Sequence, residues 1–176
     1  LKFCRRRRRA AATSAYDVRP LRQHVRPPPL LPRVTSQRQM RQRTIGILGG
    51  MSAESTALYC SRLNAQCRAR LGGLHSASLL VRSLDFAHVE ALQARGDWGA
   101  AGELLNAEAL ALERGGAELL LLATNTMHKV AATVTRGLSI PLLHIGDATA
   151  HAVREARLER PGLMATAYTM EQDFYT

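Results

Sequence analysis

The sequence predicts an α/β fold in which helices flank a parallel sheet. Four short apolar runs, at residues 44–48, 77–83, 117–124 and 141–145, alternate with longer segments that carry helix start and stop signals. The third run, Ala-Glu-Leu-Leu-Leu-Leu-Ala-Thr, is apolar on both faces, as a strand between two helix layers is. Strands alternating with helices of these lengths indicate βαβ units and a parallel sheet.

Capping residues predict where the first two long helices begin. Ser52 is a good N-cap for a helix that runs to about Arg70, where a Gly-Gly pair stops it. Asp97 can cap a second helix, from Trp98 to about Arg114, which another Gly-Gly pair closes.

Three further elements are expected after the third strand. A helix should occupy residues 126–136, and another, capped by Asp147, should run to about Leu158. Beyond a Pro-Gly break, residues 163–165 should start a fifth strand. Because ligands bind such sheets at the carboxyl ends of the strands, motifs at those ends carry the functional argument.

The net charge of +10 resides at the start of the chain. Residues 1–43 hold 13 of the 24 Lys and Arg residues and a single acid, Asp17, so residues 44–176 are slightly acidic. Hydrophobic residues make up 46% of the chain, which is enough for a packed core. The basic balance therefore gives no reason to expect that the core binds nucleic acid.

The leader, residues 1–41, is expected to be disordered, because an arginine run and several prolines replace any apolar periodicity. Three interpretations stay open: upstream sequence that is not natural protein, with Met40 as the start; an organellar transit peptide; or a nucleic-acid-binding arm. No apolar stretch approaches the roughly 20 residues of a membrane-spanning helix. Three cysteines without a CxxC pair favour a reducing compartment, so a cytoplasmic location is expected, or an organellar one if the leader is a transit peptide.

The turn after the first strand is the first candidate site. In Gly49-Gly50-Met51-Ser52, glycines allow close approach of a ligand, and the following helix N-terminus offers free N–H groups to a carboxylate or phosphate. The spacing matches neither nucleotide-binding fingerprint. A structural tight turn with an ordinary cap explains the same residues equally well.

The second candidate site is Thr124-Asn125-Thr126, at the end of the third strand. Hydroxyl and amide groups there can bind a small polar ligand, although Asn125 or Thr126 could also simply cap the next helix. His128 could act as a general base, but a hydrogen-bonded structural histidine is the more common case.

Three other residues are weaker candidates for a functional site. Gln93 follows the second strand on the ligand side, and its spacing alone predicts a solvated side chain. Cys60 and Cys67 share a helix face and are expected to be inert buried thiols, since no His or acid stands near enough in the sequence to complete a metal site.

Taken together, several segments resemble the aspartate/glutamate racemase family. They occur in family order and at family spacing across residues 42–176: TIGILGGMSAEST (44–56), LGGLHSA (71–77), SLDF (83–86), ATNTMHKV (123–130), PLLHIGDAT (141–149) and YTMEQDFY (168–175). The resemblance implies two similar α/β domains with the active site in the cleft between them. It also implies inversion of the α-carbon of a free amino acid without pyridoxal phosphate or metal.

The same resemblance assigns site residues. Met51, Gln93, Thr124, Asn125 and Thr126 match the substrate-contacting positions. The family typically uses two cysteines as opposed acid and base, and Thr124 stands at the position of the first, as it does in some other members. The second would come from a C-terminal half that the sequence does not contain. A threonine hydroxyl is a far weaker acid than a thiol, so racemisation by this chain alone is not expected.

The resemblance also predicts a domain division. Residues 42–158 would form the first racemase domain, and residues 159–176 would begin the second. The expected partner is a small amino acid, and a homodimer is conceivable from the resemblance. The alternative is a non-catalytic α/β domain that binds an amino acid or carboxylate.

Overall fold

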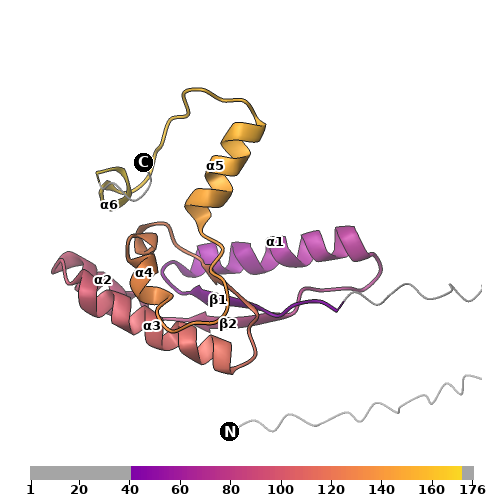
Figure 1. Ribbon diagram of the computed structural model, residues 1–176, viewed down its shortest axis with the longest axis horizontal. Helices are drawn as coiled ribbons and strands as arrows, with labels where there is room; N and C mark the ends of the chain where they lie inside the picture. The colour runs from indigo at the N-terminus through magenta and orange to yellow at the C-terminus, as the bar shows by residue number, and fades with distance from the viewer. Residues whose placement is uncertain (1–40, 172–176) are drawn as a thin grey trace, which may run out of the picture. The chain divides into compact units, whose positions relative to one another are not determined.

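The computed structural model describes residues 41–171, so the expected disorder of the leader lies outside the described residues. The strands are β1 (Ile45–Gly49), β2 (Leu79–Ser83) and β3 (Leu119–Leu122). They form a parallel sheet in the order β2-β1-β3 (Figure 1). The α/β fold with a parallel sheet is therefore confirmed.

Two long helices begin where their capping residues predicted. The helices are α1 (Ala53–Leu71), α2 (Phe86–Ala94), α3 (Trp98–Arg114), the 3₁₀ helix η1 (Thr126–Val130), α4 (Ala131–Val134), α5 (Ile145–Glu155) and α6 (Ala167–Met170). Ser52 accepts a hydrogen bond from the Ser55 N–H at the start of α1, and Asp97 accepts one from the Ala100 N–H at the start of α3. No helix within residues 41–171 is both long and apolar enough to cross a membrane.

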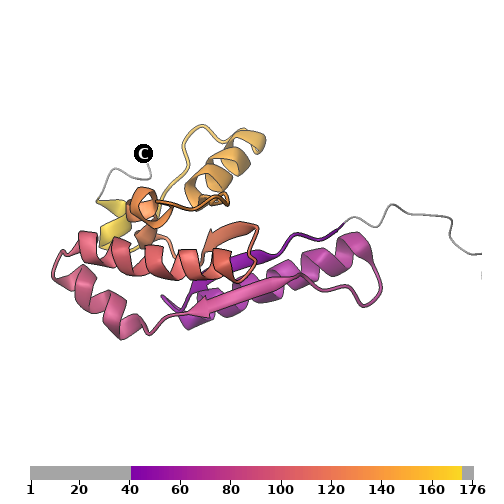
Figure 2. The same cartoon turned by 60° about the horizontal axis from the view of Figure 1, so that its bottom comes forward.

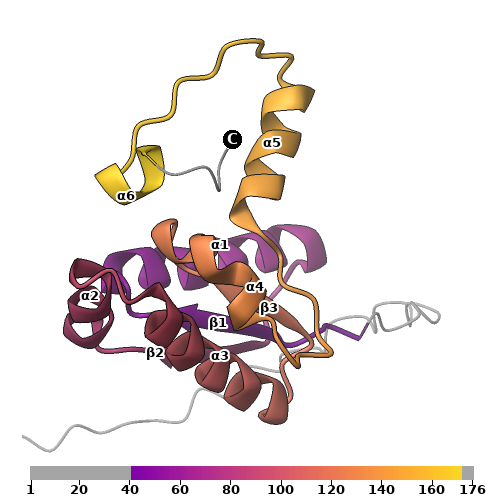
Figure 3. The ribbon, with the colours of Figure 1, turned by 60° about the vertical axis from the view of Figure 1, so that its left-hand side comes forward.

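The two long helices lie on opposite faces of the sheet (Figures 1 and 3). Leu120 and Leu122 of β3 pack into the cluster that includes residues of α3, whereas Leu121 faces a groove lined by α1. This alternation follows from the two-residue period of a strand, which sends neighbouring side chains to opposite faces. The uninterrupted Leu run thus places apolar side chains on both faces of the sheet.

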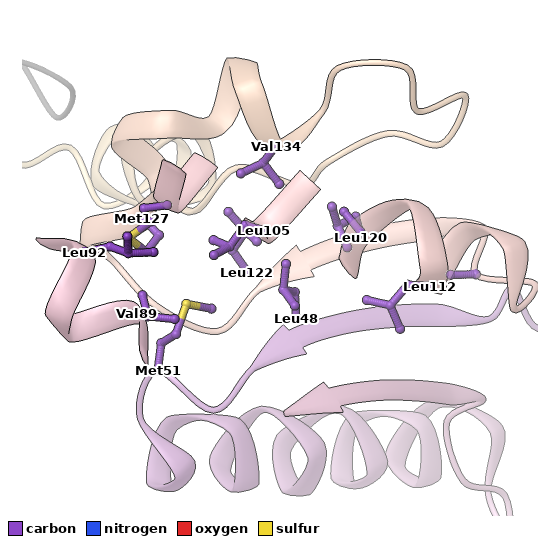
Figure 4. Close-up of a cluster of buried hydrophobic side chains, with 13 residues drawn as sticks. Leu48, Met51, Val89, Leu92, Leu105, Leu112, Leu120, Leu122, Met127 and Val134 are labelled. Atoms are coloured by element: carbon purple, nitrogen blue, oxygen red, sulfur yellow. The ribbon is translucent and has the colours of Figure 1, made fainter. Parts of the chain in front are cut away.

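The main core fills the α3 side of the sheet. Figure 4 shows its side chains following the strands, with Met51 and Met127 at the end toward which the arrows point. Leu105, Leu120 and Leu122 are at most 1% exposed, and burying a leucine fully is worth about 1.5–3 kcal/mol. The core therefore reaches the carboxyl edge of the sheet, where the candidate motifs lie.

The fourth and fifth strands of the sequence prediction were wrong. At 141–145 the chain forms a single parallel bridge, Leu120 to Leu142, made by Leu120 N–H to Pro141 O and Leu143 N–H to Leu120 O. Pro141 has no N–H to extend a ladder, and His144 already caps the next helix. Residues 163–165 have neither strand nor helix structure.

Three helix predictions also needed correction. The helix expected at 126–136 consists of η1 followed by the single turn α4. The helix expected from Asp147 begins at Ile145, is capped by the ring of His144, and ends at Glu155. The sequence analysis missed α2, which joins α3 through a tight turn in a helical hairpin (Figure 2).

Thr56 shapes the turn between β1 and α1. Its buried hydroxyl accepts a hydrogen bond from the Gly50 N–H (2.9 Å) and donates one to the Ser52 carbonyl (2.9 Å). Gly50 has a φ of +87°, and a Cβ there would collide with the backbone of Leu84. Only glycine adopts this conformation readily. The turn therefore packs closely against the backbone after β2 on one side and is hydrogen-bonded to α1 on the other.

His128 links η1 to the start of α5. It is 3% exposed, its Nε2 accepts a hydrogen bond from the Ile145 N–H (3.3 Å), and its ring meets that of His144 edge-on at 4.5 Å. Burial, and then the charge of His144, lower the pKa of His128 to about 4. The neutral ring is therefore a structural link, in agreement with the more common case.

Removing the Thr56 hydroxyl should destabilise the protein. Thr56→Val leaves the buried Gly50 N–H without its acceptor, which should cost about 1–3 kcal/mol of unfolding free energy. Thr56→Ser keeps the hydroxyl and should lose clearly less. Urea denaturation followed by circular dichroism measures both variants, and equal losses would show that the hydroxyl does not hold the turn.

His128 should make the protein sensitive to mild acid. Because its folded-state pKa lies below the ordinary 6.5, stability is complete above pH 6.5 and is lost as the pH falls toward 4, while the unfolded chain takes up the proton. The slope from this one group is at most about 1.4 kcal/mol per pH unit. His128→Gln should flatten the stability profile between pH 6.5 and 4, whereas His75→Gln, at an exposed loop, should not. Parallel profiles for wild type and His128→Gln would contradict this.

Candidate active site

The two candidate motifs meet at one edge of the sheet. The ladder continues past the strands through hydrogen bonds from Ala123 N–H to Leu48 O and from Leu84 N–H to Gly49 O, each 2.9 Å. The pairing of β1 with β3 ends at Leu48 and Leu122, so the residues that follow both strands leave the sheet at the same edge. The turn before α1 and the segment after β3 therefore begin at this common edge.

Polar groups of the β3 end are accessible at this edge. Thr124 and Thr126 are half-buried and Asn125 is exposed. Asn125 holds the N-cap position of η1, but its side chain makes no capping hydrogen bond. Asn125 is thus an exposed residue at the carboxyl edge of the sheet.

A cluster of three threonines, which the sequence analysis did not single out, completes this part of the site. The Thr126 hydroxyl lies 3.3 Å from that of Thr166 and 3.2 Å from that of Thr169, and the last two lie 3.2 Å apart. We call Thr126, Thr166 and Thr169 the threonine cluster. A Thr-x-x-Thr spacing at the start of a short helix is the signal that could have revealed it.

The side chains of Met51 and Gln93 are buried beneath this edge of the sheet. The Met51 side chain is 7% exposed and belongs to the hydrophobic core (Figure 4). Gln93 is 8% exposed, and its Nε2 donates a hydrogen bond to the Met127 sulfur at 2.9 Å. The solvated Gln93 expected from spacing alone was wrong, because the unpredicted helix α2 carries this side chain under η1.

The N-terminus of α1 can attract an anion to this edge, although the first turn of α1 also carries the carboxylate of Glu54. The N-terminus of α1 begins at this edge, and among residues 41–171 no hydrogen-bond acceptor is found for the Met51 and Ser52 N–H groups. A helix N-terminus carries a partial positive charge, which favours a carboxylate. The Gly50 N–H, in contrast, is satisfied by Thr56 and is not free for a ligand.

The thiols of α1 lie away from this edge. Cys60 and Cys67 are half-buried free cysteines in the middle of α1. Cys60 stands seven residues beyond the start of the helix, about 10 Å along its axis. Within the described part of the chain, no group of three His, Cys, Asp or Glu residues could hold a metal ion.

Comparison with known proteins places these residues in a family context. Residues 48–176 match the family model of Asp/Glu/hydantoin racemases. A crystal structure from Yersinia pestis, of a protein assigned as an Asp/Glu racemase, superposes with a TM-score of 0.73 at 47% identity, covering 76% of this chain and 58% of that one. An aspartate racemase homologue from Pyrococcus horikoshii OT3 superposes with a TM-score of 0.68 at 33% identity and the same coverage.

This chain therefore spans less than two thirds of the length of either solved relative. The match to the family model extends over most of the chain and includes the turn before α1, the end of β3 and the threonine cluster. On these grounds the chain belongs to the Asp/Glu/hydantoin racemase family.

Proposed function

We propose that this chain supplies one wall of the substrate site of an amino-acid racemase. The observation that carries the proposal is that the Thr124-Asn125-Thr126 segment and the turn leading into α1 follow paired strands at the same carboxyl edge of the sheet. One end of an amino acid is a carboxylate, which suits a helix N-terminus, and hydroxyl and amide groups can bind its other polar atoms. Racemase-family membership supports this interpretation.

We further propose that residues 42–158 form the first of two racemase domains and that residues 159–176 begin the second. Both solved relatives extend beyond the part that this chain matches. The α1 face of the sheet supports the proposal, because it contains an apolar groove of about 380 Å³ between α1, β3 and α5. A strand buried on both faces is the rule for parallel sheets, so further racemase structure is the natural cover for this groove.

The proposed reaction inverts the α-carbon without pyridoxal phosphate or a metal. Removing the α-proton creates a carbanion, which needs electrostatic stabilisation and one acid/base group on each face of the carbon. Thr124 stands where the resemblance puts the first of these groups. Its hydroxyl can bind and orient the substrate, but it is not a ready proton carrier at neutral pH.

We do not propose His128 as the base. Its Nε2 accepts a hydrogen bond from the Ile145 N–H, the ring is 3% exposed, and its buried Nδ1 has no hydrogen-bond partner among residues 41–171. The thiols Cys60 and Cys67 lie along α1, away from the edge. Within residues 41–171 the site therefore offers binding groups but no matched pair of proton carriers.

The substrate would be aspartate, glutamate or another small polar amino acid. A homodimer is part of the proposal by family resemblance, and no nucleic-acid partner is proposed. The second candidate function is a non-catalytic domain that binds an amino acid, and the hydroxyl at position 124 favours it for this chain taken alone.

Asn125 should contribute more to ligand affinity than to stability. Asn125→Ala removes an exposed amide at the site and should weaken binding of aspartate or glutamate about tenfold, because a hydrogen bond to a charged group is worth about 1.5–3 kcal/mol. Isothermal titration calorimetry measures this loss of affinity. Urea denaturation measures the accompanying loss of stability, which should be smaller, since a lost cap costs only about 1 kcal/mol.

The matched control for Asn125 is Asn64→Ala. Asn64 ties α1 to the loop before β2 through hydrogen bonds to Cys60 O and from Ala77 N–H, far from the edge. This variant should lose stability and keep its affinity. Unchanged affinity in Asn125→Ala would remove Asn125 from the site.

The 176-residue chain should bind an amino acid without inverting it. Inversion needs two opposed proton carriers, and an open site remains wet, which weakens stabilisation of a carbanion. NMR in deuterated water should show no α-proton exchange of aspartate or glutamate above the rate without protein. Exchange that disappears in Thr124→Val would show that the Thr124 hydroxyl does carry the proton, and would overturn the expectation.

A further inference from the structure

Three side chains from three separate elements stack beside the threonine cluster. Trp98 begins α3, Lys129 lies in η1 and Tyr168 lies in α6. The Lys129 ammonium lies 4.2 Å from the centre of the Trp98 ring, and the Tyr168 ring meets Trp98 edge-on with centroids 5.7 Å apart. Both geometries are attractive, because the face of an indole is electron-rich and aromatic rings favour T-shaped contacts.

The segment that carries Tyr168 has little backbone support. Among the described residues, the backbone hydrogen bonds of residues 166–171 are local, as in Thr169 N–H to Thr166 O. Residues 158–166, which lead to α6, contain neither helix nor strand. Yet Thr169 is only 1% exposed. Side-chain contacts must therefore set where α6 lies.

Trp98 is well placed to provide such a contact. Asp97 N–H donates to Leu92 O, Trp98 N–H donates to Gly96 O, and the Asp97 carboxylate caps α3, so the backbone around the indole is fixed from several sides. Lys129 makes no salt bridge among residues 41–171, and its ammonium contacts the face of the Trp98 ring.

We infer that Trp98 is a positioning residue, which holds α6 through Tyr168 and η1 through Lys129, so that the threonine cluster forms at the end of β3. The inference rests on the proposed function to the extent that this cluster borders the substrate site. Trp98 itself need not touch the substrate. It acts through the hydroxyls of Thr166 and Thr169, which it keeps beside that of Thr126.

The chain offers its own reporter for this contact, because Trp98 is its one tryptophan. Tyr168→Leu should change the Trp98 emission spectrum and abolish the nuclear Overhauser contact between the Thr126 and Thr169 methyl groups. Tyr168→Phe keeps the ring and should preserve both signals. Lys129→Met should change the emission, and Lys129→Arg should restore it, since a guanidinium also stacks on indole.

Affinity for aspartate and glutamate gives the functional readout. Tyr168→Leu should weaken binding about three- to tenfold, which corresponds to the loss of one aromatic contact, and Tyr168→Phe should bind like wild type. Tyr59→Leu is the matched control, because Tyr59 lines the groove on the α1 face. It should alter neither Trp98 emission nor affinity.

The three measurements test the contact of Trp98 with Tyr168, the positioning role of Trp98 and the proposed function separately. Unchanged emission and an intact methyl contact in Tyr168→Leu would overturn the inference, as would equal losses in Tyr168→Leu and Tyr59→Leu, which would indicate general destabilisation. Loss of the methyl contact with unchanged affinity would overturn the positioning role. If wild type binds neither amino acid, the proposed function fails, while emission and the methyl contact still decide whether Trp98 holds α6.

Discussion

The parallel pairing of β1 with both neighbours is the constraint on which the site depends. Because Leu48 pairs with Leu122 and Gly49 with Ser83, both neighbouring strands end level with β1. The turns that follow β1, β2 and β3 must therefore fit side by side along one short edge of the sheet. The Gly50 turn satisfies this demand by packing against the Leu84 backbone, with Thr56 holding it from the helix side. A side chain at Gly50 would push that edge apart.

The parts of the fold that sequence predicted are those set by local chemistry. Ser52 and Asp97 cap their helices through their own side chains, and α3 has the predicted bounds. The Leu run of β3 was identifiable because a strand covered on both faces is apolar throughout. Thr124, Asn125 and Thr126 could be placed at the edge because parallel strands present their carboxyl ends together.

The parts that sequence missed depend on distant partners. Residues 141–145 are as apolar as a strand, but their pairing stops at one bridge, since His144 turns the chain into α5. Histidine is not among the residues that commonly cap helices, so the sequence favours Asp147 as the cap although the His144 ring occupies that position. Gln93 was expected in solvent because α2 was not recognised, and its burial depends on a sulfur 34 residues away.

His128 and Thr124, the two candidate proton carriers near the edge, differ in burial and in chemistry. His128 has the chemistry of a base, yet its desolvated ring accepts a backbone N–H and resists protonation until about pH 4. Thr124 has the accessible position, yet its hydroxyl lacks the acidity. The same edge brings together a helix N-terminus, an exposed amide and a threonine cluster, which are the groups on which the proposed recognition of an amino acid rests. Under the proposed function, these groups would contribute to recognition from one side of the substrate, whereas inversion also requires an acid and a base on opposite sides of one carbon.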